Sequence, residues 1–61
     1  MNRYYTIVRT YDDDTFYREK TDDIKRALYV AAIYLEDPTC NNIKIWDNEG
    51  TSILTYWRDA Q

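Results

Sequence analysis

The segment over residues 22–36 constrains the fold more than any other part of the chain, because it alone has helical periodicity. The spacing of one helix face is found at Ile24, Ala27, Leu28, Ala31 and Leu35. The segment stops before Pro38, since the residue that precedes a proline avoids helical angles. We therefore predict one helix over residues 22–36, about four turns long, which packs through its Leu28 and Leu35 stripe.

Runs rich in Tyr, Thr, Ile and Val flank this helix on both sides. Such residues suit a pleated, half-buried surface, and they predict strands at about residues 3–11, 15–20, 42–47 and 51–58. Three aspartates at 12–14 join the first pair of strands. Loops of two or three residues both fit there, so the sequence leaves the register of this hairpin open.

The second hairpin has a more specific turn signal. Asp47-Asn48-Glu49-Gly50 is typical of a type I turn closed by a glycine in the left-handed region, a G1 bulge. The turn places Asp47 opposite Thr51. Continued pairing then predicts one face made of Ile43, Ile45, Ile53 and Trp57, and another made of Lys44, Trp46, Leu54 and Tyr56.

Together these elements predict an α+β fold and a single domain over residues 1–61. The layout is a two-layer ββαββ arrangement: a four-stranded, mainly antiparallel sheet with one helix packed on one face. We expect the helix to lie on the isoleucine face.

A second apolar side of the helix, made of Tyr29, Val30 and Ile33, then has no partner within a chain of 61 residues. Contiguous apolar patches on small proteins mark interaction sites. We predict a homodimer in which this side meets its own copy across a two-fold axis. The outer sheet face of Trp46, Leu54 and Tyr56 is left for a second protein partner.

The residue inventory disfavours catalysis. The chain has no histidine, one cysteine and one glycine, so it lacks the commonest general base, a Cys-His nucleophile and a glycine-rich phosphate loop. The aspartate runs lack the calcium-loop pattern, and we expect Thr21 or Asp22 to cap the helix. We predict no enzyme activity, no metal and no cofactor.

The charge pattern keeps two other hypotheses open. Eleven acids against eight bases give a net charge of −3. The acidic turns could serve a decoy that occupies the nucleic-acid-binding surface of another protein, through Asp12, Asp13, Asp14, Asp22, Asp23, Asp47 and Glu49. A single-strand binder would use Trp46 and Tyr56 with Lys44 and Arg58, but the net acidity argues against nucleic acid.

Location follows from what the sequence does not show. No apolar region follows the first residues, so we expect no signal peptide. No run approaches the length of a membrane span. A single cysteine fits a reducing cytoplasm.

The segment "LEDPTCNNIKIWDNEGTSILTY" combines a helix end, a short polar loop and an I-x-I-x-D-x-x-G hairpin. This layout resembles that of small ββαββ accessory proteins of Gram-positive bacteria and their phages or mobile elements. The resemblance covers the second half of the chain best. It implies an accessory role through protein contacts and assigns no site residue.

Overall fold

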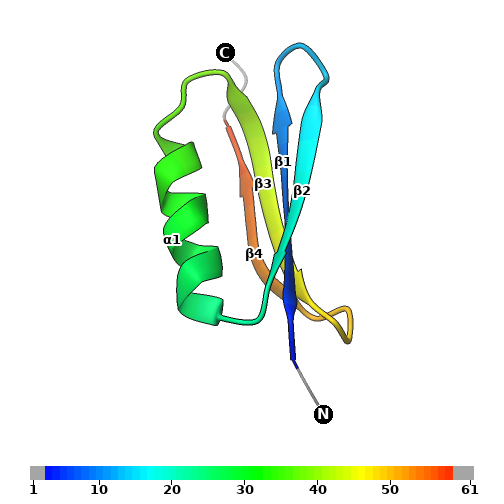
Figure 1. The fold of residues 1–61 in the computed structure, drawn as a ribbon. Coiled ribbons are helices and arrows are strands. Elements are labelled where there is room, and N and C mark those ends of the chain that lie inside the picture. Colours follow the sequence, from blue (N-terminus) through cyan, green and yellow to red (C-terminus); the bar gives the residue numbers. More distant parts are fainter. Residues whose placement is uncertain (1–2, 59–61) are drawn as a thin grey trace.

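The computed structural model describes residues 3–58 and shows one helix lying along one face of a four-stranded sheet (Figure 1). In chain order the elements are β1 (Tyr5–Tyr11), β2 (Phe16–Thr21), α1 (Ile24–Leu35), β3 (Cys40–Asp47) and β4 (Ser52–Trp57). The strand order is β2-β1-β3-β4, and every neighbouring pair is antiparallel. The predicted ββαββ fold is confirmed.

Small residues bring the helix onto the sheet. Ala27, Val30 and Ala31 are the buried residues of α1. They join a core completed by Ile7, Cys40, Ile43 and Ile45. The backbone of the helix lies closest to β1, β2 and β3. The core is therefore one layer thick and is centred on β1 and β3, with Leu54 and Tyr56 of β4 packed at its margin.

The predicted inward stripe of the helix is correct for its alanines and wrong for its two leucines. Leu28 is 44% exposed and Leu35 is 39% exposed, whereas Ala27 and Ala31 are buried. Alanines allow a helix backbone to approach a sheet of isoleucines closely, and close packing governs protein interiors. The helix is therefore rotated relative to our prediction, which moves Val30 from the outer side into the core.

The helix begins later than predicted because Asp23 caps it. The Asp23 carboxylate accepts a hydrogen bond from the Lys25 backbone N–H at 2.9 Å, the interaction typical of an N-cap. The expected cap, Thr21 or Asp22, is thus wrong by one or two residues, and the Thr21 hydroxyl accepts instead from the Asp23 N–H at 3.2 Å. The hydrogen bonds accepted by these two side chains thus hold the short connection between β2 and α1 in place.

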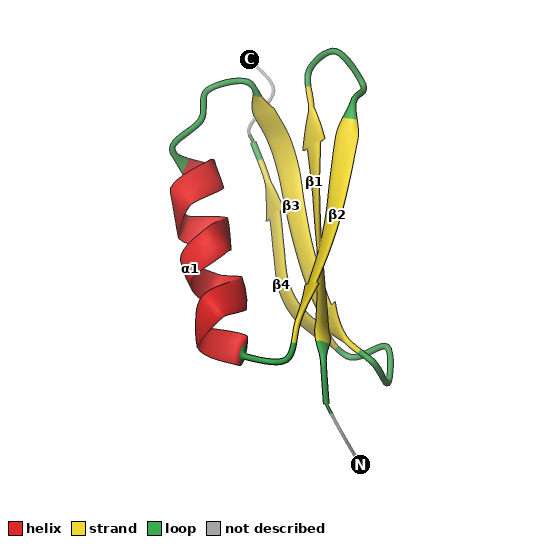
Figure 2. Cartoon of the chain, in the orientation of Figure 1, coloured by secondary structure: helices red, strands yellow, loops and turns green. Residues whose placement is uncertain are grey.

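Both hairpins use the same turn geometry. In the second, Gly50 has φ of 86° and its N–H donates to Asp47 O at 3.0 Å, as the G1 bulge predicts. In the first, Asp14 has φ of 70° and its N–H donates to Tyr11 O at 2.9 Å. The first loop therefore has three residues, and an aspartate holds the position that a glycine holds in the second. Figure 2 shows the two turns at opposite ends of the sheet.

A bulge in β4 overturns the predicted faces of that strand. Trp46 pairs with Ser52, but Ile45 pairs with Leu54, so Ile53 is an extra residue between them. Beyond the bulge every side chain is on the opposite face from the one predicted. Leu54 and Tyr56 therefore lie on the helix side of the sheet and pack against the core.

The twin turns generate a paired prediction. Asp14→Gly should raise the free energy of unfolding by about 0.5–1 kcal/mol, because glycine enters the left-handed region without a Cβ penalty. Gly50→Ala should lower it by about 1 kcal/mol. No atom lies within 4 Å of a Cβ added at Gly50, so that loss measures backbone strain alone. Urea unfolding gives both values, and a stabilising Gly50→Ala would contradict the assignment.

Candidate functional site

The structure separates the residues predicted for the homotypic contact. Tyr29 is 65% exposed and Ile33 is 49% exposed on the outer side of α1, whereas Val30 is 8% exposed and belongs to the core. Val30 is thus removed from the predicted contact. A side chain already packed against the sheet offers no surface to a partner.

The predicted second surface is not one surface. Trp46 lies on the sheet face away from the helix, because its neighbour Ile45 points into the core. Leu54 and Tyr56 lie on the opposite face as a result of the bulge at Ile53. A single partner cannot contact all three of Trp46, Leu54 and Tyr56 on one flat face.

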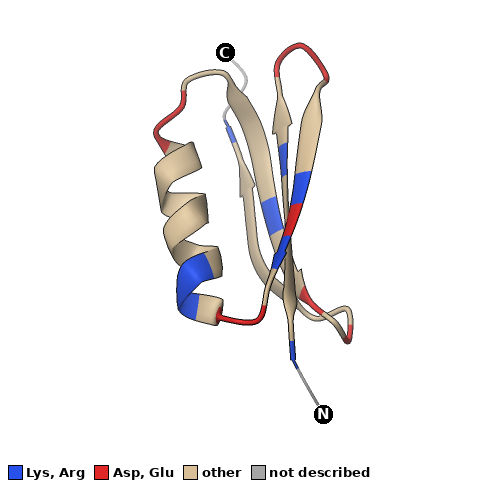
Figure 3. Ribbon diagram, viewed as in Figure 1, with Lys and Arg blue, Asp and Glu red and all other residues tan. Residues whose placement is uncertain are grey.

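The predicted acidic patch is divided between the two ends of the molecule. Figure 3 shows the acidic positions at the turns and helix ends, with the 12–14 turn at one end of the sheet. The remaining members lie at the other end, and they are Asp22, Asp23, Asp47 and Glu49.

Several of these carboxylates are already engaged by their own turns. Asp13 accepts from the Thr15 N–H at 3.1 Å and from its hydroxyl at 2.6 Å. Asp47 accepts from the N–H groups of Glu49 and Thr51, each at 2.9 Å. These acids therefore serve local turn chemistry.

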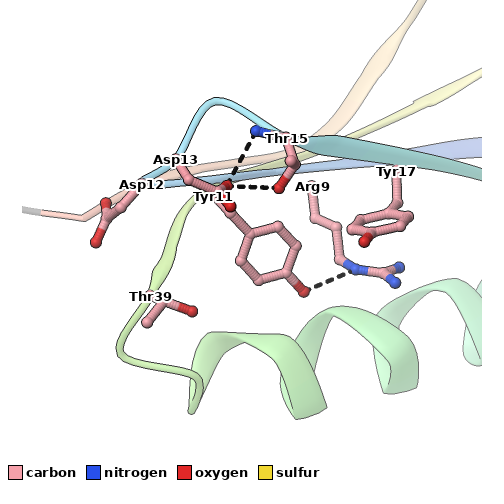
Figure 4. Close-up of a pocket in the computed structure, with 7 residues that line it drawn as sticks. All are labelled: Arg9, Tyr11, Asp12, Asp13, Thr15, Tyr17 and Thr39. Carbon is pink, nitrogen blue, oxygen red and sulfur yellow. Dashed lines mark hydrogen bonds between the residues drawn. The ribbon is translucent and has the colours of Figure 1, made fainter.

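A pocket of about 560 Å³ opens between the first hairpin and the loop after α1 (Figure 4). It is lined by Arg9, Tyr11, Asp12, Asp13, Thr15, Tyr17 and Thr39. The Asp12 N–H donates to Thr39 O at 3.0 Å and so ties the two walls together. The lining mixes one cation with carboxylates and hydroxyl groups.

Arg9 is the central polar group of this pocket. Its Nε donates to the Tyr11 hydroxyl at 2.9 Å, and its Nη1 pairs with Glu19 at 2.5 Å. The guanidinium carbon lies 3.8 Å from the centroid of the Tyr34 ring and 4.7 Å from that of Tyr17. A cation held between two aromatic faces is stabilised by both ring quadrupoles. Arg9 thereby links β1, β2 and α1.

Arg9 and Asp12 of the pocket already have hydrogen-bond partners within the chain. Burial of Arg9 disfavours its charge, but the hydrogen bonds to Tyr11 and Glu19 prevail and raise its pKa. The hydrogen bond from Arg58, at 2.6 Å, lowers the pKa of Asp12. Arg58 also donates to Pro38 O. Each of the two guanidinium groups already pairs with a carboxylate of the chain, so the contacts around this pocket hold the first hairpin, the helix and the chain end at Arg58 together.

Cys40 is placed in the core and is not set up as a nucleophile. It is 1% exposed, and burial raises the pKa of its thiol. A raised pKa reduces the thiolate fraction, and the thiolate is the reactive form. Across residues 3–58 no group of three or more Cys, Asp or Glu side chains is arranged to hold a metal ion.

The sheet face away from the helix carries residues that the sequence analysis missed, alongside Lys44 and Trp46, which it named. Strand pairing arranges its side chains in cross-strand rows. The rows, read from β2 to β4, are Phe16–Thr10–Asn42–Trp57, then Arg18–Val8–Lys44–Thr55, then Lys20–Thr6–Trp46–Ser52. We call this surface the open face. Strand pairing across three interfaces assembles it, so the pattern of any one strand could not reveal it.

Comparison with known protein families, with curated proteins and with solved structures found no match for this chain. The resemblance to accessory proteins of Gram-positive bacteria and their phages therefore stays a prediction. No helix within residues 3–58 is long and apolar enough to cross a membrane.

The arginine clamp gives a stability prediction. Arg9→Lys should lower the free energy of unfolding by about 1–2 kcal/mol, because an ammonium cannot stack as a plane between two rings while bonding Tyr11 and Glu19. Its matched control is Arg18→Lys on the open face, expected to stay within about 0.5 kcal/mol of the wild type. Equal effects of the two substitutions in urea unfolding would contradict the role given to Arg9.

The loop carboxylates give a pH dependence. The pKa of Asp12, of Asp13 and of Asp37 is lowered from 3.8, by hydrogen bonds from Arg58, Thr15 and Thr39 respectively. A lowered pKa contributes stability above 3.8 that is lost as the pH falls below that value. We expect the variant with Asp12→Asn, Asp13→Asn and Asp37→Asn to be less stable than the wild type at neutral pH and to lose less stability on acidification. Urea unfolding at a series of pH values from neutral to below 3.8 measures both effects. If the free energies of unfolding of the variant and the wild type fell in parallel with pH, the assignment would be contradicted.

Proposed function

We propose that the chain is a non-enzymatic protein-interaction module that forms a homodimer through the outer side of α1. The observation that carries this proposal is the exposure of Tyr29 and Ile33 on a helix that no other element of residues 3–58 covers. The two residues are four apart, so they are neighbours on one helix surface. Sealing one such apolar side chain from water contributes roughly 1.5–3 kcal/mol.

The charges around these two residues favour a second copy as the partner. Lys25 and Arg26 are exposed at the beginning of α1, and Glu36 is exposed at its end. This order opposes the helix macrodipole, which favours acids at the beginning and bases at the end. A partner helix running antiparallel would bring its own Glu36 to Arg26 and relieve that conflict.

Two-fold symmetry gives the same register for the apolar and the charged pairs. In an isologous contact, if one residue meets a second on the partner, that second residue meets the first. An antiparallel arrangement that sets Tyr29 against Ile33 of the other copy also sets Arg26 against Glu36 of the other copy, because both pairs share a midpoint at residue 31. The outer side of α1 is thus self-complementary in the register of its apolar and charged pairs.

The single cysteine of the chain is free, and we propose a reducing cytoplasm as its compartment. The acidic-decoy hypothesis has less support, because its carboxylates are split between the two ends of the sheet and Asp12 is paired with Arg58.

Molar mass across a concentration series tests the dimer. We expect the mass to approach twice 7.4 kDa as concentration rises, and Ile33→Asp to hold it at the monomer value. The matched control is Leu28→Asp, an exposed residue about 140° around the helix, which should still dimerise. A monomeric wild type at all accessible concentrations would refute the proposal.

A charge exchange tests the register. Arg26→Glu should weaken the dimer by placing like charges together, and the double variant Arg26→Glu with Glu36→Arg should restore it. Coupling energies of this kind are measured by a double-mutant cycle. Purely additive effects would exclude the antiparallel pairing of Arg26 with Glu36.

A further inference from the structure

The open face is a basic surface on an acidic protein. Its cationic side chains are Arg18, Lys20 and Lys44, and none of its members within residues 3–58 is Asp or Glu. The described acids lie in turns and at the ends of the helix and of β3 (Figure 3), except Glu19, which points to the helix side and pairs with Arg9. Charges separated by more than about 10 Å are largely screened at moderate salt. A ligand on the open face therefore meets a local positive potential.

Exposed aromatic rings accompany these cations. Phe16 is 62% exposed on edge strand β2, and Trp57 is 57% exposed on the opposite edge strand β4. The two share one cross-strand row, with only Thr10 and Asn42 between them. Three strand spacings of about 4.8 Å separate them. Trp46, two rows away, adds a half-buried ring.

Cations lie in and beside the rows that carry the rings. The row next to Phe16 and Trp57 contains Arg18 and Lys44, and it follows at about 7 Å, the rise of two strand residues. The Lys44 ammonium lies 4.9 Å from the centroid of the Trp57 ring. The ammonium lies over one face of the ring, so a planar group stacked on the other face would have a cation nearby for an attached anion.

We propose that the open face binds single-stranded nucleic acid. Unpaired bases stack on Phe16, Trp46 and Trp57, and phosphates pair with Arg18, Lys20 and Lys44. Stacking platforms combined with cations bind single strands with little sequence preference. An acidic peptide would satisfy the cations but leave the rings without flat partners, and a duplex keeps its bases inside the stack.

This inference is independent of the proposed dimer. The open face and the outer side of α1 lie on opposite sides of the molecule, since α1 covers the other face of the sheet (Figure 1). A helix-mediated dimer leaves both open faces accessible.

Fluorescence anisotropy with labelled oligo-dT and oligo-rU of about twelve nucleotides tests the proposal at about 50 mM salt. We expect saturable binding in at least one arm, and the stronger arm identifies the preferred sugar. Both tryptophans of the chain lie on the open face, so binding should also quench intrinsic emission. The log–log salt slope should be about −2, from three phosphate contacts at about 0.7 each. Absence of binding in both arms, or equal binding of a duplex or of polyglutamate, would overturn the proposal.

Variants assign the roles. Trp57→Leu should weaken binding about five- to a hundredfold, and Trp57→Phe should retain most of it, because only the aromatic replacement can stack. Lys20→Gln should reduce the salt slope by about 0.7, whereas the same substitution on the helix, Lys25→Gln, should leave it unchanged. Equal effects at residues 20 and 25 would show that net charge alone drives binding, against a site on the open face.

Discussion

The close approach of α1 to the sheet is the constraint on which the rest of the structure depends. Ala27 and Ala31 are buried against a sheet surface centred on Ile43 and Ile45. Because this contact is made by small side chains, the helix lies low over β1, β2 and β3, and larger residues must fill the margins. Tyr34 does so and also holds the Arg9 guanidinium at 3.8 Å. The clamp around Arg9 thus extends a small core with stacked and hydrogen-bonded groups where apolar side chains are few.

The parts of the fold that local chemistry determines could be predicted from the sequence. The ββαββ order and the Gly50 turn follow from residue preferences that act within a few positions. The faces of β4 could not be predicted, because the run from Ile53 to Trp57 alternates apolar residues in both phases. The bulge chooses between them by burying Leu54 and Tyr56 against the core. That choice depends on packing between strands and leaves no signature in the strand itself.

The prediction of the buried helix face was inaccurate for a related reason. Periodicity places Ala27, Ala31 and the two leucines on one broad face, and the greater hydrophobicity of Leu28 and Leu35 centred our prediction on the leucine edge of that face. The structure selects the alanine face because the available space above the isoleucines decides how near the helix can come. Val30 follows the alanines inward. Of the predicted homotypic contact, the exposed pair Tyr29 and Ile33 is therefore what remains available to a partner.

The distribution of charge shows how an acidic chain can present a basic surface. Asp13, Asp23 and Asp47 accept hydrogen bonds from backbone N–H groups in turns and at the helix cap, so structural demands draw acids to the ends of strands. Within β2 and β3 the backbone N–H groups do not need carboxylate acceptors, and the open-face positions there hold Arg18, Lys20 and Lys44. Net charge, which we used to disfavour nucleic acid, averages over the acids at the turns and the bases on the open face.

If the helix also mediates a dimer, the assembly presents two open faces on its outer sides. Simultaneous use of both faces by one long strand would raise the overall affinity above that of a single face with no new contact.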